Sequence, residues 1–170
     1  MTLRIELPAD REPVTWVWGE VVPKIGPAAA TYSAAVYEHT TLSLREFESA
    51  RARIAQVNHC LFCLDWRTER DGETVDEALY GQVANWRDAD AAAALSDRER
   101  LAAEYAERFA EDHLSLDTDE DFWTRMHAAY TDAEIIELSM CIGSWIAFGR
   151  LNHVLGLDAA CVLPSHLARR

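Results

Sequence analysis

Positive charge is scarce in this sequence. Its 16 lysine and arginine residues face 29 aspartate and glutamate residues, and the formal net charge is -13. A protein that binds nucleic acid needs a basic surface to neutralise phosphates, and no basic cluster interrupts the acidic background here. The final HLARR is too short to supply one. We therefore expect no nucleic-acid partner.

Long apolar runs are missing too. The longest, LSMCIGSWIAF at residues 138–148, is about half the length that a membrane span requires. The N-terminal MTLRIELPADREP is interrupted by charged residues and lacks the apolar stretch of a signal peptide. Both absences favour a cytoplasmic protein without a membrane partner.

The four cysteines do not resemble a disulfide framework, because a chain of 170 residues, 49% of them apolar, can bury a core without cross-links. We expect reduced thiols. The length fits one domain over residues 1–170, in which residues 1–20 are the candidate for an N-terminal arm.

The alternation typical of strands is absent except in TWVWGEVV, where Trp16 and Trp18 could also begin a helix. Helix signals dominate instead, with three capping boxes that each precede an apolar pattern of helical period: Ser43–Glu46, Ser96–Glu99 and Thr131–Glu134. The third helix is apolar on most sides and should end at Gly156. Weaker helices are expected at 24–40, 74–86 and 119–129. The sequence thus predicts an all-α, multihelical bundle of six or seven helices.

Reactive side chains are concentrated in NHCLFCLDWR, residues 58–67, which holds Cys60 and Cys63 with two residues between them. A zinc site would need two further ligands, but Cys141 and Cys161 lie twenty residues apart and the six histidines are scattered. No metal is therefore expected. The pair is then either part of the core, where cysteine packs as a small hydrophobe, or a redox dithiol at the start of a helix.

The surrounding pattern leaves these two interpretations open. Asn58 could end one helix and begin the next, which would place the cysteines where backbone N–H groups stabilise a thiolate. Against this, an apolar stripe continues through Val57, Leu61 and Leu64 without a change of phase.

The segment LREFESARARIAQVNHCLFC, residues 44–63, resembles the core of the carboxymuconolactone decarboxylase and alkylhydroperoxidase D family. That core has a helix with a glutamate, then a sequence such as RVAQLNGC-x-x-C, then a histidine four residues after the second cysteine. Glu48 lies twelve residues before Cys60, at the family spacing, and residues 53–58 match the approach to the first cysteine. The later stretches 95–110 and 130–157 look like the family's later helices, so the resemblance covers roughly residues 25–157.

The resemblance implies an all-α fold of the alkylhydroperoxidase D-like type that assembles as a homo-oligomer, commonly a dimer, trimer or hexamer. It also implies that Cys60 and Cys63 reduce a hydroperoxide, form a disulfide and are reduced again by a thiol or dihydrolipoyl partner. Glu48 and a histidine would relay protons, and no cofactor is expected. True lactone decarboxylases of the family do not depend on this cysteine pair, so that reaction is not expected here.

The sequence departs from the family at position 67, where Arg67 replaces the relay histidine. An arginine stays protonated and cannot shuttle protons, although it can stabilise a thiolate. If residues 60–67 are helical, Arg67 shares a face with Cys63, so we expect it to enter the same pocket and to pair with Glu48.

Neighbouring side chains offer further roles. His59 adjoins Cys60 and could replace the missing relay, or it could simply cap a helix. Trp66 could line a substrate pocket, or it could pack in the core or at an interface. His127 and His153 could approach the site from other helices. We expect Cys141 to be buried and inert, and Cys161 to be a partly exposed thiol.

The leading hypothesis is a thiol-dependent peroxidase or disulfide oxidoreductase in which Cys63, rather than Cys60, attacks. The rival is a non-catalytic helical oligomer whose dithiol senses redox state or is structural. A third is a binding protein for a small apolar ligand held between helices. Apart from the resemblance, Trp16, Trp18 and the apolar helix at 135–148 offer more apolar surface than a small bundle hides, so a homo-oligomer is expected.

Overall fold

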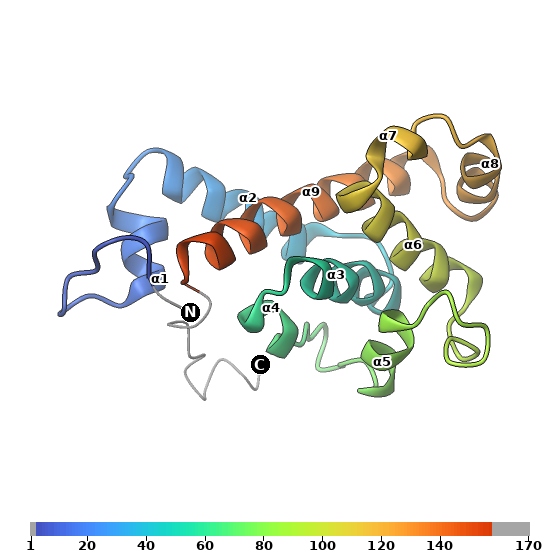
Figure 1. The fold of residues 1–170 in the computed structure, drawn as a ribbon, viewed down its shortest axis with the longest axis horizontal. Helices are drawn as coiled ribbons and strands as arrows, with labels where there is room; N and C mark the ends of the chain where they lie inside the picture. The colour runs from blue at the N-terminus through green and yellow to red at the C-terminus, as the bar shows by residue number, and fades with distance from the viewer. Residues whose placement is uncertain (1–2, 158–170) are drawn as a thin grey trace.

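The computed structural model describes residues 3–157, and Figure 1 shows their arrangement. Within that range the regular elements are helical, and β geometry is confined to an isolated bridge between Arg70 and Glu73. The all-α prediction is therefore confirmed. The elements are α1 (Pro13–Thr15), the π-helix η1 (Trp16–Glu20), α2 (Ile25–His39), α3 (Leu44–Asn58), α4 (Leu61–Asp65), α5 (Ala78–Ala84), α6 (Asp97–Glu111), α7 (His113–Leu116), α8 (Glu120–Ala129) and α9 (Asp132–Leu155).

The predicted helix starts are confirmed at α3, α6 and α9. In each, the Ser or Thr side chain accepts a hydrogen bond from the backbone N–H of the glutamate three residues on, and that glutamate accepts one from the cap's own N–H. The stop at Gly156 is confirmed as well, since this residue takes a left-handed conformation with φ of 73° and closes α9. These signals are local, which is why the sequence reveals them.

The weaker helices were predicted with mixed success. α2 and α8 lie where expected, but the helix expected at 74–86 is shortened to α5. An Asp76 side chain that accepts the Ala78 N–H at 2.7 Å holds the preceding residues in a turn. Trp16 and Trp18 belong to η1, and α7 occupies part of the connection expected at 115–121. Cys161 lies outside the described residues.

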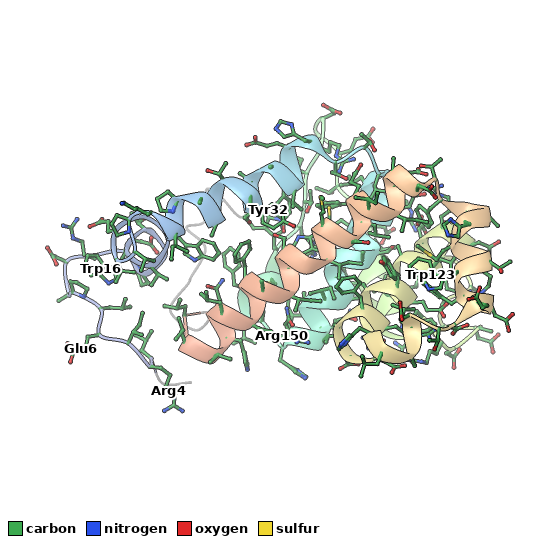
Figure 2. All side chains as sticks on the ribbon, turned by 90° about the horizontal axis from the view of Figure 1, so that it is seen from above. Arg4, Glu6, Trp16, Tyr32, Trp123 and Arg150 are labelled. Atoms are coloured by element: carbon green, nitrogen blue, oxygen red, sulfur yellow. The ribbon has the colours of Figure 1, made fainter. Side chains whose placement is uncertain are left out.

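Helix α9 crosses the whole molecule, from α8 at one end to the N-terminal segment at the other (Figure 1). Seen from above, Tyr32 lies between α2 and α9, while Trp16 and Trp123 lie at opposite ends (Figure 2). The Tyr32 hydroxyl donates to the Met140 carbonyl at 2.7 Å, which fastens α2 along α9.

Helix α3 lies between two groups of buried apolar side chains. Phe47 and Ile54 face the larger group, shared with α6, α8 and α9, whereas Ala52 faces a smaller one beneath α5. Because both sides of α3 are covered, even the polar residues of its middle turns are buried. The burial of Glu48 follows from this position.

An arginine on α6 joins three helix ends. Arg98 donates through Nε to Glu46 and through Nη2 to Glu134 at 2.7 Å, the capping glutamates of α3 and α9. Its Nη1 donates to the Ala129 carbonyl at the end of α8. The capping glutamates are therefore tertiary contacts as well as local ones.

Replacing Glu134 by glutamine tests this arrangement through its pH dependence. Hydrogen bonds from the Thr131 backbone and from Arg98 lower the pKa of Glu134 from 4.5 to about 2. A carboxyl group whose pKa is lowered in the folded state stabilises the fold at pH values above its ordinary pKa. This stabilisation is lost as the pH falls towards the folded-state pKa.

We expect Glu134→Gln to lower the free energy of unfolding by about 1 kcal/mol at neutral pH, and we expect the gap to close between pH 4.5 and about 2. Urea titrations at a series of pH values measure this. Glu120→Gln, an exposed carboxylate in the first turn of α8, is the control and should follow the wild type. A gap of the same size at about pH 2 would contradict the prediction.

Candidate functional site

The Cys-x-x-Cys segment begins at a break between two helices. α3 ends at Asn58, and His59 adopts a left-handed conformation with φ of 51° as its C-cap. The apolar stripe was expected to continue through Leu61 and Leu64, but the structure leaves these two residues 52% and 37% exposed to solvent. The structure therefore places the cysteines at a helix junction and not in the interior of one long helix.

Asn58 holds this junction against α9. Its Nδ2 donates to the Trp145 carbonyl at 2.9 Å, and its Oδ1 accepts from Arg150 Nε at 3.0 Å. Gly149 faces the same amide, and a Cβ at that position would lie 2.5 Å from Asn58 Nδ2. A side chain at position 149 would therefore push Asn58 away from the helix that anchors it.

The two cysteines differ in exposure. Cys60 is fully buried and serves as the N-cap of α4, and its Sγ lies 3.4 Å from the Cys63 backbone nitrogen, which donates to it. Cys63 is half-buried and lines a cavity. Both cysteines thus lie at the first turn of α4, which is the position that the redox interpretation requires.

Behind the cysteines lies a buried ion pair on α3. Arg51 donates through Nε and Nη2 to the two carboxylate oxygens of Glu48, and the side chains are 3% and 0% exposed. Burial alone would lower the pKa of Arg51, but the adjoining Glu48 carboxylate reverses this and raises it. The pair is thus a fixed pair of charges in the interior.

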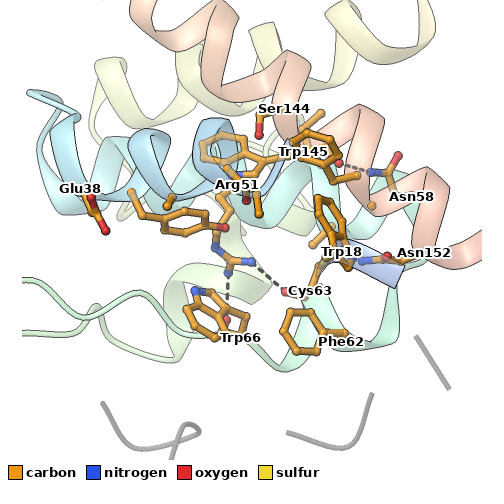
Figure 3. Close-up of a pocket in the computed structure, with 18 residues that line it drawn as sticks. Trp18, Glu38, Arg51, Asn58, Phe62, Cys63, Trp66, Ser144, Trp145 and Asn152 are labelled. Atoms are coloured by element: carbon orange, nitrogen blue, oxygen red, sulfur yellow. Dashed lines mark hydrogen bonds between the residues drawn. The ribbon is translucent and has the colours of Figure 1, made fainter. Parts of the chain in front are cut away.

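Arg51 also carries the segment that follows Cys63. Its Nη1 donates to the Cys63 carbonyl at 2.7 Å, and its Nη2 to the Trp66 carbonyl at 3.0 Å (Figure 3). These carbonyls lie at the end of the five-residue α4, where no following turn of helix can satisfy them. One guanidinium therefore pairs with Glu48 and holds α4 in position.

Tyr80 completes the surroundings of Glu48 from α5. Its hydroxyl donates to Glu48 Oε2 at 2.8 Å. Burial raises the pKa of Tyr80, and the negative charge of Glu48 raises it further, so the phenol remains a donor.

The predicted pairing of Arg67 with Glu48 is wrong. Arg67 donates through Nε and Nη2 to both oxygens of Glu77, at 2.7 and 3.0 Å, and its guanidinium lies 3.9 Å from the centre of the Tyr80 ring. The chain leaves the helix at Trp66, so Arg67 does not share a helical face with Cys63. Arg51, one turn from Glu48, already occupies the expected place.

The cavity beside Cys63 has a volume of about 480 Å³. Arg51 and Trp66 line it, which is one of the two positions considered for Trp66, but Arg67 and His59 are not among the residues that line it. His59 is exposed and its N–H caps α3, so the structure supports the capping role. Six aromatic side chains form much of the wall: Trp18, Tyr37, Phe62, Trp66, Trp145 and Phe148 (Figure 3).

The remaining candidates lie apart from this cavity. His127 pairs with Asp132 at 3.4 Å, and neither it nor His153 lines the wall. Cys141 is buried in α9, and burial raises its pKa to about 12, which makes it a poor nucleophile, as expected.

Sequence reasoning missed three residues of the site. The sequence could have indicated Arg51, because this residue stands three positions after Glu48 and therefore on the same helical face. It holds no such indication for Tyr80 and Tyr37, since they come from α5 and α2, and only the tertiary fold brings them to α3 and α4.

Among the described residues, His, Cys, Asp and Glu side chains form no group of three placed to hold a metal ion. In residues 3–157 no helix has both the length and the apolar character to cross a membrane. No family model, curated protein or solved structure matches this chain.

Removal of Arg51 should destabilise the fold far more than removal of Arg67. Arg51→Ala leaves the Glu48 carboxylate buried without its counter-charge, which costs about 3–5 kcal/mol. Arg67→Ala removes a partner from Glu77, whose side chain is 71% exposed, so the loss should be about 1 kcal/mol or less. Denaturant unfolding measures both, and equal losses would contradict the role given to the buried pair.

Proposed function

We propose that this protein is a thiol-dependent peroxidase or disulfide oxidoreductase that uses Cys60 and Cys63. The observation that carries the proposal is the unequal placement of the two cysteines. Cys63 lines the cavity, where a substrate can reach it, and the buried Cys60 Sγ lies against the Cys63 backbone. Such a pair suits one attacking and one resolving thiol.

The proposed reaction is a two-electron reduction. The Cys63 thiolate attacks the outer oxygen of a hydroperoxide, ROOH, and the O–O bond breaks to give a Cys63 sulfenic acid and an alkoxide, which takes a proton and leaves as ROH. The Cys60 thiol then displaces water from the sulfenic acid and forms the disulfide. A dithiol of the dihydrolipoyl class returns two electrons and two protons through thiol–disulfide exchange.

Arg51 supports the attacking thiolate in this proposal. It is a permanent cation that hydrogen-bonds the Cys63 carbonyl and lines the same cavity. An opposite charge nearby favours the thiolate form. Both carboxylate oxygens of Glu48 accept hydrogen bonds from that guanidinium, so the part proposed for Glu48 is to hold Arg51 in place.

Tyr37 is the proposed proton donor to the leaving alkoxide. It lines the cavity, and burial raises its pKa, an effect strengthened by Glu48 and Cys63 and opposed by Arg51. A phenol kept neutral in this way can donate a hydrogen bond throughout the physiological range.

The alkylhydroperoxidase D-like type of fold remains part of this proposal. It is supported by the helix that carries Glu48, its break before Cys60 and the spacing between them. The non-catalytic alternative predicts the same disulfide without sustained turnover when peroxide and dihydrolipoamide are supplied together.

Peptide mapping after treatment with dilute peroxide tests the proposal. The wild type should form a Cys60–Cys63 disulfide, and Cys60→Ser should stop at a Cys63 sulfenic acid that dimedone traps. Cys63→Ser should leave Cys60 as a thiol, and Cys141→Ser, a buried cysteine outside the cavity, should behave as the wild type. Oxidation of Cys60 at an undiminished rate in Cys63→Ser would rule out this division of roles.

We also propose a homo-oligomer, built on the outer face of α9. Four apolar side chains lie exposed along that face, and they are Ile136 at 56%, Met140 at 57%, Leu151 at 39% and Val154 at 68%. They recur at helical spacing with the small Gly143 and Ala147 between them. Trp18 is not available for this role, because it packs within the chain against Phe148 at 4.8 Å.

A second copy fits this face in antiparallel orientation. The stripe is centred near residue 145, so a two-fold axis there would set Ile136 of one α9 against Val154 of the other. The N-terminal end of each α9 would then approach the C-terminal end of its partner, which suits the helix dipoles.

Met140→Glu should therefore shift the protein towards the monomer in sedimentation experiments, because it buries a charge at the contact. Leu114→Glu, at a site 79% exposed on α7, is the matched control and should leave assembly unchanged. A wild type that sediments as a monomer at micromolar concentration would refute this assembly.

A further inference from the structure

The cavity is far larger than a peroxide group needs. Its volume of about 480 Å³ lies in the range of pockets that hold organic ligands, roughly 300–1,000 Å³. A small inorganic peroxide would leave most of the apolar wall in contact with trapped water, which is unfavourable. The wall therefore indicates a substrate with a substantial organic part.

The aromatic side chains of the cavity wall are arranged in a way that suits a ligand with a flat ring. Trp18 meets Phe148 edge to face at 4.8 Å, Tyr37 meets Trp145 at 6.5 Å, and Phe62 lies 5.9 Å from Trp66. These residues come from η1, α2, α4 and α9, so the aromatic lining surrounds the space instead of forming one side of it. Aromatic rings pack best against other rings in such offset or edge-on arrangements.

Buried polar atoms without partners indicate where the ligand makes hydrogen bonds. The Ser144 side chain lines the cavity, is 1% exposed and has no hydrogen-bond partner for its Oγ. A helical serine commonly bonds the carbonyl one turn back, but here that carbonyl, of Met140, accepts from Tyr32. Trp66 Nε1 and Asn152 Oδ1, from two further lining residues, are also buried and unsatisfied. The ligand thus needs both acceptor and donor atoms.

The charges of the wall favour a neutral ligand. Arg51 is occupied by Glu48 and by the carbonyls of Cys63 and Trp66. Glu38 is exposed at the rim and would repel an anion.

We infer that the cavity binds a neutral aryl-substituted molecule that carries a hydrogen-bonding oxygen group, and that the substrate is an aryl hydroperoxide of this class. The assignment of a hydroperoxide as the reactive group rests on the proposed function. The assignment of a neutral aryl body rests only on the residues that form the cavity wall. The ring would lie among Trp18, Trp145 and Phe148, with the hydroperoxide directed to Cys63.

A substitution that fills the cavity and leaves both cysteines unchanged tests the aryl body of the ligand separately from its hydroperoxide group. Ala34 lines the cavity from α2 and is exposed, so Ala34→Phe places a ring in the space without disturbing the core. Ala28→Phe, an exposed alanine on the same helix outside the cavity, is the matched control. The probes are cumene hydroperoxide, hydrogen peroxide and the unreactive alcohol 2-phenyl-2-propanol.

We expect cumene hydroperoxide to oxidise Cys63 at least tenfold faster than hydrogen peroxide in the wild type and in Ala28→Phe. In Ala34→Phe that advantage should disappear, and calorimetry should show that 2-phenyl-2-propanol no longer binds. Equal rates with both peroxides and no heat from the alcohol in the wild type would overturn the inference and leave the peroxidase proposal standing. Binding of the alcohol with no oxidation of Cys63 by either peroxide would overturn the peroxidase proposal and keep the aryl-binding cavity.

Discussion

The buried ion pair between Glu48 and Arg51 sets the position of everything around the cysteines. A carboxylate with no exposure is unfavourable unless a cation and hydrogen bonds compensate it, and Arg51 supplies both. The same guanidinium holds the carbonyls of Cys63 and Trp66. The location of α4, and with it the access of Cys63 to the cavity, therefore depends on two side chains of α3.

A second layer keeps that pair in place. Tyr80 donates to Glu48, Arg67 stacks on the Tyr80 ring, and Glu77 holds Arg67 at the surface. These contacts become weaker towards the surface. The Glu48–Arg51 pair is buried away from water, whereas the Arg67–Glu77 pair is exposed to water that screens its charges. Arg67 thus acts on the site through the ring of Tyr80 and not by direct contact with Glu48.

Local signals predicted much of the fold, and tertiary contacts account for the failures. The capping boxes at Ser43, Ser96 and Thr131 are complete within four residues, so the sequence alone placed three helix starts. The break after Asn58 was left open, because the exposure of Leu61 and Leu64 depends on what packs over α4. The error at Arg67 came from extending the helix one turn too far, past Trp66.

The composition of the cavity wall determines how its electrostatics depend on pH. None of the described residues that line the cavity is a histidine, so no imidazole there changes its charge near neutral pH. The positive charge comes from a permanently protonated arginine, and the proton donors are a tyrosine of raised pKa, indole N–H groups and a serine. The Arg51 cation therefore stays in place across the physiological range. The reactivity of the site should then follow the ionisation of Cys63 itself, with no second titration from a relay residue.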